Sequence, residues 1–140
     1  MQIDDISIRG IESKAKKIAE KYNILFIIIY GSVAKGDIKE ESDIDIALLG
    51  KKEISFNNLI AINNDFIDIF NNDKIDIKSL HNTNPLFRYE VTKDGMLLYG
   101  DKEDYIRYRI YAFRSFCESK KLFNIKKEQT KKQINNLLKK

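Results

Sequence analysis

Tyr30 to Ile46 reads Y-G-S-V-A-K-G-D-I-K-E-E-S-D-I-D-I, and this stretch decides the fold of the chain. It begins at the end of Ile24 to Tyr30, an unbroken apolar run rich in β-branched residues, which predicts a strand covered on both faces. A Gly-Ser turn follows, and after ten further residues Asp43 and Asp45 open a second strand. Because side chains alternate along a strand, both aspartates project to one face while Ile44 points to the other.

The two aspartates and the turn together predict a site for a metal-bound phosphate compound. Side chains two residues apart on a strand lie roughly 6.6 Å apart, close enough for both carboxylates to bind hard cations spaced ~3.5–4 Å, as in two-metal phosphoryl chemistry. Gly31 lets the backbone approach a bulky anion, and the N–H groups of a helix starting at Ser32 would point at phosphate. Asp-x-Asp alone is common in surface turns, so the interpretation depends on finding the Gly-Ser turn and the two aspartates together at this spacing.

Helical and strand patterns alternate along the rest of the chain. The expected helices cover Asp4/Asp5 to Tyr22, Ser32 to Lys35 (closed by Gly36-Asp37), Ser55 to Phe70 (stopped by Asn71-Asn72-Asp73), Pro85 to Lys93, and a long element from Asp101. Glu40-Glu41-Ser42 is an expected loop. The expected strands after the first are Asp43 to Leu49, Lys74 to Leu80 and a short edge strand, Met96 to Tyr99.

The last helix carries two apolar stripes: Tyr105, Tyr108, Ala112 and Phe116 on one, and Ile106, Ile110, Phe113 and Cys117 on the next. Its aromatic residues, including Phe113, favour core positions over a recognition surface, with Tyr111 on the less apolar side as the candidate partner contact. Beyond Leu122 the hydrophobic density falls, and we expect a frayed or partner-dependent helical end. Cys117 is expected to be a small buried hydrophobe.

The composition indicates one soluble globular domain, with 140 residues, 43% hydrophobic and 33% charged residues. We expect a domain over residues 1–122 and a basic, partly helical tail over 123–140. Residues 120–140 hold eight Lys and one Glu, a net of +7 against +4 for the whole chain, which leaves −3 for residues 1–119. A lysine-rich run is more often a solvated helix face than a nucleic-acid site, so direct nucleic-acid binding is not expected.

The cysteine and histidine content excludes two kinds of stabilising or metal-binding site. The single cysteine excludes an intrachain disulfide framework, and the single histidine, His81, excludes a His/Cys zinc site within one chain. No apolar run reaches the ~18–20 residues of a membrane span, so no membrane association and a cytoplasmic location are expected.

Gly31-Ser32, ten residues, and then Asp43-Ile44-Asp45 resemble the nucleotidyltransferase superfamily of the DNA polymerase β type, and the short length resembles its minimal nucleotidyltransferase (MNT) family. The resemblance spans roughly residues 10–118. It implies the nucleotidyltransferase fold, an α/β (α+β) domain with a small mixed β-sheet flanked by helices and a long C-terminal helix. The family's third carboxylate is matched by Asp76. Lys35 departs from the family's usual Arg, which keeps the charge and loses the bidentate fork toward phosphate.

The resemblance also implies a mechanism. Asp43 and Asp45 would hold two Mg²⁺ ions, and Asp76 would complete the second metal site or accept the proton of the attacking hydroxyl. Gly31, Ser32 and Lys35 would contact the phosphates of ATP, which lose pyrophosphate when the nucleotidyl group is transferred.

Three hypotheses for the acceptor follow. MNT proteins of this size resemble antitoxins that pair with a HEPN-domain ribonuclease toxin and transfer AMP from ATP to a toxin tyrosine. The second hypothesis is a small-molecule nucleotidyltransferase of the aminoglycoside-modifying kind, although those usually carry a further substrate-binding domain. The third is a non-catalytic antitoxin that masks its partner by contact, which gives no reason to gather three carboxylates.

Overall fold

The computed structural model describes residues 5–31 and 43–139 of the chain, with side chains described from Gly10 onward. The elements follow in the order α1 (Asp5–Tyr22), β1 (Ile24–Tyr30), β2 (Ile44–Gly50), α2 (Phe56–Phe70), β3 (Ile75–Ser79), α3 (Pro85–Asp94), β4 (Met96–Tyr99) and α4 (Lys102–Leu138). The expected helix from Ser32 to Lys35 and the expected loop at Glu40 to Ser42 lie outside the described residues.

The four strands form one mixed sheet in the order β3-β2-β1-β4. Strand β1 pairs antiparallel with both β2 and β4, whereas β2 and β3 are parallel and are connected through α2. The central position of β1 explains its unbroken apolar sequence, because Ile27, Ile28 and Ile29 are all buried. The predicted mixed sheet flanked by helices is confirmed, and β4 is an edge strand as predicted.

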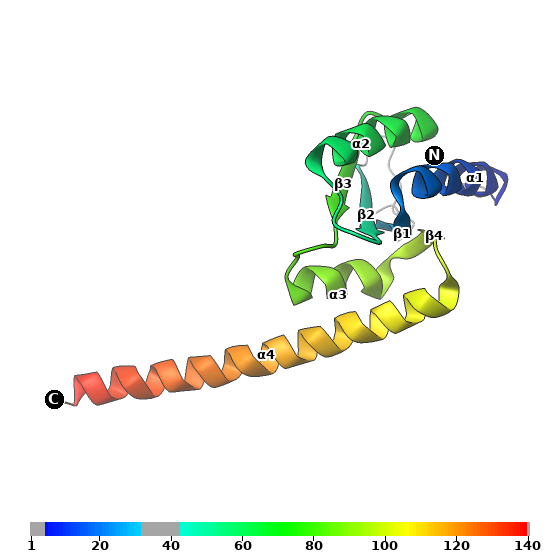
Figure 1. Ribbon diagram of the computed structural model, residues 1–140. Helices are drawn as coiled ribbons and strands as arrows, with labels where there is room; N and C mark the ends of the chain where they lie inside the picture. Colours follow the sequence, from blue (N-terminus) through cyan, green and yellow to red (C-terminus); the bar gives the residue numbers. More distant parts are fainter. Residues whose placement is uncertain (1–4, 32–42, 140) are drawn as a thin grey trace.

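Helices cover both faces of the sheet (Figure 1). Helices α1 and α2 pack on one face around a core that includes Ala15, Ile29, Ile46 and Phe66. Helices α3 and α4 lie on the opposite face, where the core includes Phe26, Ile28, Ala47, Leu80, Val91 and Tyr105. A change of register between Ile24 and Phe26 lets β1 send these two side chains to opposite faces.

Local sequence signals set the helix ends. Ser55 caps α2 by accepting a hydrogen bond from the Asn58 N–H at 3.2 Å, and Asn71 ends that helix in the left-handed conformation at φ 49°. Asn84 caps α3 in the same way, directly before Pro85. The buried face of α2 is narrower than the helix's apolar content suggests, since Phe56 is 75% exposed and Ile60 is 47% exposed.

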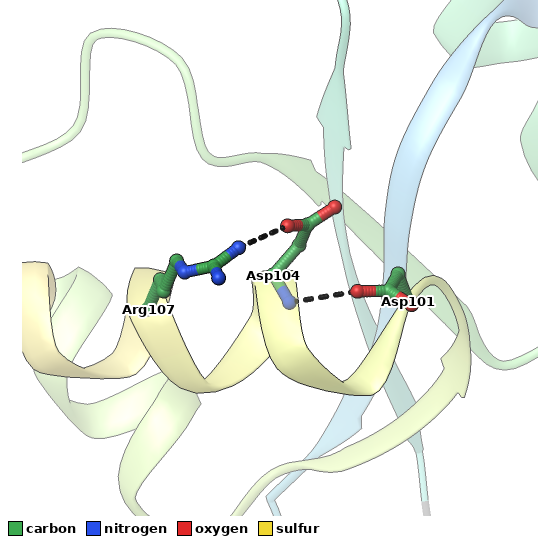
Figure 2. A network of polar contacts seen from close by, with 3 residues as sticks. All are labelled: Asp101, Asp104 and Arg107. Atoms are coloured by element: carbon green, nitrogen blue, oxygen red, sulfur yellow. Dashed lines mark hydrogen bonds and ion pairs between the residues drawn. The ribbon is translucent and has the colours of Figure 1, made fainter.

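Helix α4 begins with a small polar network (Figure 2). The Asp101 carboxylate caps it by accepting from the Asp104 N–H at 2.9 Å, and Arg107 donates to the Asp104 carboxylate at 3.0 Å. The acidic first turn also complements the positive end of the helix dipole. These contacts fix where the chain turns from β4 into α4.

Helix α4 extends well beyond the rest of the domain (Figure 1). One of our two expectations was that the helix frays beyond Leu122, but it continues to Leu138. Every residue from 117 to 139 is exposed. A single helix that is exposed on all sides for this length gains little from packing within its own chain. The other expectation, a partner-dependent end, stays a prediction.

Only one stripe of α4 is buried. Tyr105 and Ala112 are in the core and Phe116 is half-buried, so the core prediction holds for that stripe. The core interpretation is wrong for Phe113, which is 52% exposed, and the prediction of a buried Cys117 is also wrong, because that thiol is exposed. The reason is geometric: α3 and the sheet cover one side of α4, and the neighbouring stripe faces outward. Tyr111, the candidate partner contact, is 52% exposed as well, and its contact with a partner stays a prediction.

Within residues 5–31 and 43–139, no helix combines the length and the apolar character needed to cross a membrane.

Candidate active site

The strand register gathers the predicted carboxylates at one end of the sheet. Tyr30 at the end of β1 is opposite Asp45 on β2, and Asp45 is opposite Asp76 on β3. Directly paired residues project to the same face of a sheet, so these three side chains form a row across three strands. Asp43 directly precedes β2 and is exposed. The sequence therefore predicted correctly that Asp45 and Asp76 come together.

Electrostatics within this row follow from the proximity of like charges. Burial raises the pKa of the Asp45 carboxyl, and the negative charges of Asp76 and then Asp43 raise it further. The pKa of Tyr30 is raised to about 12, first by burial and then by Asp45 and Asp76. The negative charges of all three aspartates thus act on one small region.

Two features of the backbone at position 31 require glycine. Its φ of +78° lies in the left-handed region, which a side chain disfavours. A Cβ atom built on Gly31 would collide with the Asp45 carboxylate oxygen Oδ2. Gly31 therefore brings its backbone directly against the carboxylate row, and its predicted role in binding phosphate stays a prediction.

Sequence reasoning missed two neighbours of the row, Lys78 and Phe87. The Lys78 ammonium lies 3.8 Å from the Asp76 carboxylate and 5.6 Å from the centre of the Phe87 ring. Phe87, on α3, packs edge-to-face against Tyr30 with ring centres 5.9 Å apart. Lys78 could have been found from sequence, because it is two residues after Asp76 on the same strand; Phe87 comes from a different element and carries no local signal.

The fit of a metal ion can be tested against these positions. No three His, Cys, Asp or Glu side chains in the described part of the chain are arranged to hold one ion. The carboxylate of Asp76 instead faces Lys78. The donor chemistry of Asp45 and Asp76 and their pairing on adjacent strands suit Mg²⁺, which prefers carboxylate oxygens.

A cavity of about 330 Å³ opens beside the row. It is lined by Tyr30 and Gly31 from the end of β1 and by Phe87, Glu90, Val91, Lys93 and Asp94 from α3. Its volume is at the small end of the range for ligand sites. The arrangement thus provides clustered carboxylates, an adjacent turn that needs glycine, and space for a substrate next to both.

Two predicted phosphate contacts, Ser32 and Lys35, lie outside the described residues. The only histidine, His81, donates a ring N–H to the Gly50 carbonyl oxygen at 3.0 Å, which gives it a structural contact away from the carboxylate row.

Comparisons with known proteins agree with this geometry. The family model described as "Polymerase beta, Nucleotidyltransferase" matches residues 13–104. The protein adenylyltransferase MntA of Aphanizomenon flos-aquae is 35% identical over 116 residues, which cover 73% of this chain and 75% of that protein.

Two solved structures have the same fold. One is described as a toxin–antitoxin with AMP-PNP; it has a TM-score of 0.72 and 17% identity over 85% of this chain and 97% of that chain. The other is described as a tri-AMPylated Shewanella oneidensis HEPN toxin in complex with an MNT antitoxin; it has a TM-score of 0.67 and 15% identity over 88% of this chain and 98% of that chain.

Proposed function

Because the chain belongs to the polymerase β nucleotidyltransferase family, we propose that it is an Mg²⁺-dependent protein adenylyltransferase that transfers AMP from ATP to a tyrosine of a partner HEPN-domain toxin and thereby acts as its antitoxin. The observation that carries the proposal is the row formed by Asp45 and Asp76 on adjacent parallel strands, directly beside the Gly31 turn.

The choice of acceptor is supported by the relatives. The similar Aphanizomenon flos-aquae protein is named a protein adenylyltransferase, and one structure with this fold is a complex that contains an AMPylated HEPN toxin. The AMP-PNP in the other toxin–antitoxin structure supports ATP as the nucleotide. A HEPN toxin as partner and ATP as nucleotide therefore fit the fold and the carboxylate row, and the tyrosine acceptor is part of the proposal.

Each residue would have a defined role in the reaction. Asp43, Asp45 and Asp76 would hold two Mg²⁺ ions, which when bound neutralise phosphate charge and lower the pKa of an attacking hydroxyl. The tyrosine oxygen would form a bond to the α-phosphorus of ATP while the bond from that phosphorus to the bridging oxygen breaks and pyrophosphate leaves. Asp76 would accept the hydroxyl proton. Ser32 and Lys35 would contact the departing phosphates.

The binding of the nucleotide donor, Mg²⁺-ATP, is tested by thermal denaturation with and without this ligand. Carboxylates that repel one another in the free protein should be stabilised by the metal-bound nucleotide, so millimolar Mg²⁺ with ATP raises the melting temperature. The Asp45→Asn variant, which lacks one charged ligand, serves as the matched control and should show little shift. An unchanged melting temperature of the wild-type chain at millimolar Mg²⁺-ATP would contradict the proposed nucleotide site.

The acceptor is tested with labelled ATP and a HEPN-domain toxin, the partner class that the relatives support. Label on the HEPN protein that disappears with Asp45→Asn supports protein adenylylation. Label found only on a small molecule would replace the proposal with small-molecule nucleotidyl transfer. Inhibition of the toxin without any label would replace it with masking by contact.

A further inference from the structure

A groove outside the carboxylate row runs between α3 and α4. It encloses about 460 Å³, and its α4 side is formed by Ile106, Ile110 and Phe113. These three side chains are 53%, 47% and 52% exposed, although each is large and apolar. Tyr89 of α3 lines the opposite wall and is held by stacking on Phe116, with ring centres 4.5 Å apart and planes 5° apart. The apolar floor is thus open to solvent while its wall is fixed by packing.

Three cations surround this floor. Lys93 from α3 and Arg109 and Arg114 from α4 line the groove, and no carboxylate from the described part of the chain does. Within residues 5–31 and 43–139, none of these three cations forms an ion pair. Lys93 also lines the cavity beside the carboxylate row, so the groove and the candidate active site share one side chain. A ligand in the groove would therefore lie near the site of transfer.

The spacing of the apolar side chains suits a helix as the ligand. Ile106, Ile110, Phe113 and the exposed Cys117 follow one another at intervals of four, three and four residues, which places them along one stripe of α4. Such a stripe accepts the apolar face of an amphipathic helix in the helix-in-groove mode of recognition. The stripe is continuous for about three helical turns.

Charge identifies the kind of helix. If a second copy of this chain paired antiparallel along the same stripe, Ile106 would meet Cys117 of the copy and Arg109 would meet its Arg114, which brings like charges together. Acidic side chains flanking an apolar face would instead pair with all three cations. Nucleic acid fits less well, because the floor is largely aliphatic and Tyr89 already uses one ring face on Phe116.

We propose that the α3/α4 groove docks an acidic amphipathic helix of the protein substrate and so holds the acceptor tyrosine close to the carboxylate row. This docking role rests on the proposed function, because it assumes that the acceptor is a protein.

The test measures the dissociation constant of the complex between this chain and the HEPN-domain toxin that the proposed function assigns as its partner. Ile110→Asp, and separately the double variant Arg109→Glu with Arg114→Glu, should weaken binding at least tenfold. Ile60→Asp is the matched control, since Ile60 is equally exposed at 47% but lies on α2, across the sheet. Raising the salt concentration should weaken the wild-type complex more than the double-charge variant.

A second measurement needs no substitution. Cys117 is the only cysteine in the chain and ends the apolar stripe, so bound HEPN protein should slow its alkylation by iodoacetamide, read by mass spectrometry of its peptide. The docking site would be overturned by groove variants that bind the HEPN protein as tightly as the wild type does, or by a Cys117 that is not protected in the complex. If the wild-type chain still transfers AMP in that case, the proposed function stands. If the groove variants lose binding to an RNA oligonucleotide but still bind the HEPN protein, the groove is a nucleic-acid site and the docking proposal is wrong. A wild-type chain that does not bind the HEPN protein overturns both proposals.

Discussion

Replacing Gly31 with alanine tests the turn beside the carboxylate row. At a φ of +78°, a residue with a Cβ atom costs about 1–2 kcal/mol relative to glycine. The new Cβ would also meet the Asp45 carboxylate, which must move away from its position in the row. For a chain of 140 residues, roughly 4 °C of melting temperature corresponds to 1 kcal/mol, so Gly31→Ala should lower the melting temperature by about 4–8 °C.

Gly10→Ala is the matched control, because it makes the same chemical change where nothing opposes it. A Cβ on Gly10 meets no atom within 4 Å, and alanine in a helix is more stable than glycine by roughly 0.5–1 kcal/mol. Gly10→Ala should therefore raise the melting temperature by about 2–4 °C. The two variants are predicted to have opposite signs.

Both variants should be assayed by thermal denaturation and by AMP transfer. Gly31→Ala should lose at least tenfold in transfer rate because Asp45 is displaced, while Gly10→Ala keeps the wild-type rate. A Gly31→Ala variant with unchanged stability and full activity would refute both the conformation of the turn and its contact with Asp45.

Other substitutions test the row and the fold separately. Since the pKa of Asp45 is raised in the folded state, the ligand-free protein loses stability as the pH rises through that pKa. Asp45→Asn should therefore have a higher melting temperature than the wild type at pH 7. Below about pH 4 the Asp45 carboxyl is protonated in both the folded and the unfolded chain, so the difference in melting temperature should vanish. Asp76→Asn should slow transfer while Mg²⁺-ATP still shifts the melting temperature, and a wild-type transfer rate would show that Asp76 has no role in the chemical step. Ser55→Ala removes the α2 cap and should cost about 1 kcal/mol in urea denaturation with transfer unchanged, whereas a loss of transfer would mean that α2 positions the site.

Much of the fold followed from local sequence signals. The bounds of β1 were predicted to the residue, because an apolar run ending in a glycine turn leaves little ambiguity. The helix starts predicted at Ser55 and at Pro85 lie within one residue of the observed starts of α2 and α3. Strand alternation and the resemblance together also placed Asp45 and Asp76 side by side.

Features that depend on contacts between distant elements were not predicted. Whether Phe113 and Cys117 are buried depends on which side of α4 meets α3, and the sequence pattern of α4 offers two apolar stripes of similar strength. Phe87 joins Tyr30 only through the packing of α3 on the sheet. Periodicity identifies an apolar stripe, but tertiary packing decides which stripe is covered.

The most direct measurement of the central claim is the mass of the HEPN-domain protein after incubation with this chain, Mg²⁺ and ATP. The account predicts that one or more AMP units are added to a tyrosine of that protein, located by peptide mass spectrometry. The addition should be absent with Asp45→Asn, although that variant is expected to fold at least as stably as the wild type. An unmodified HEPN protein after incubation with the wild-type chain, or equal modification by Asp45→Asn, would contradict the account.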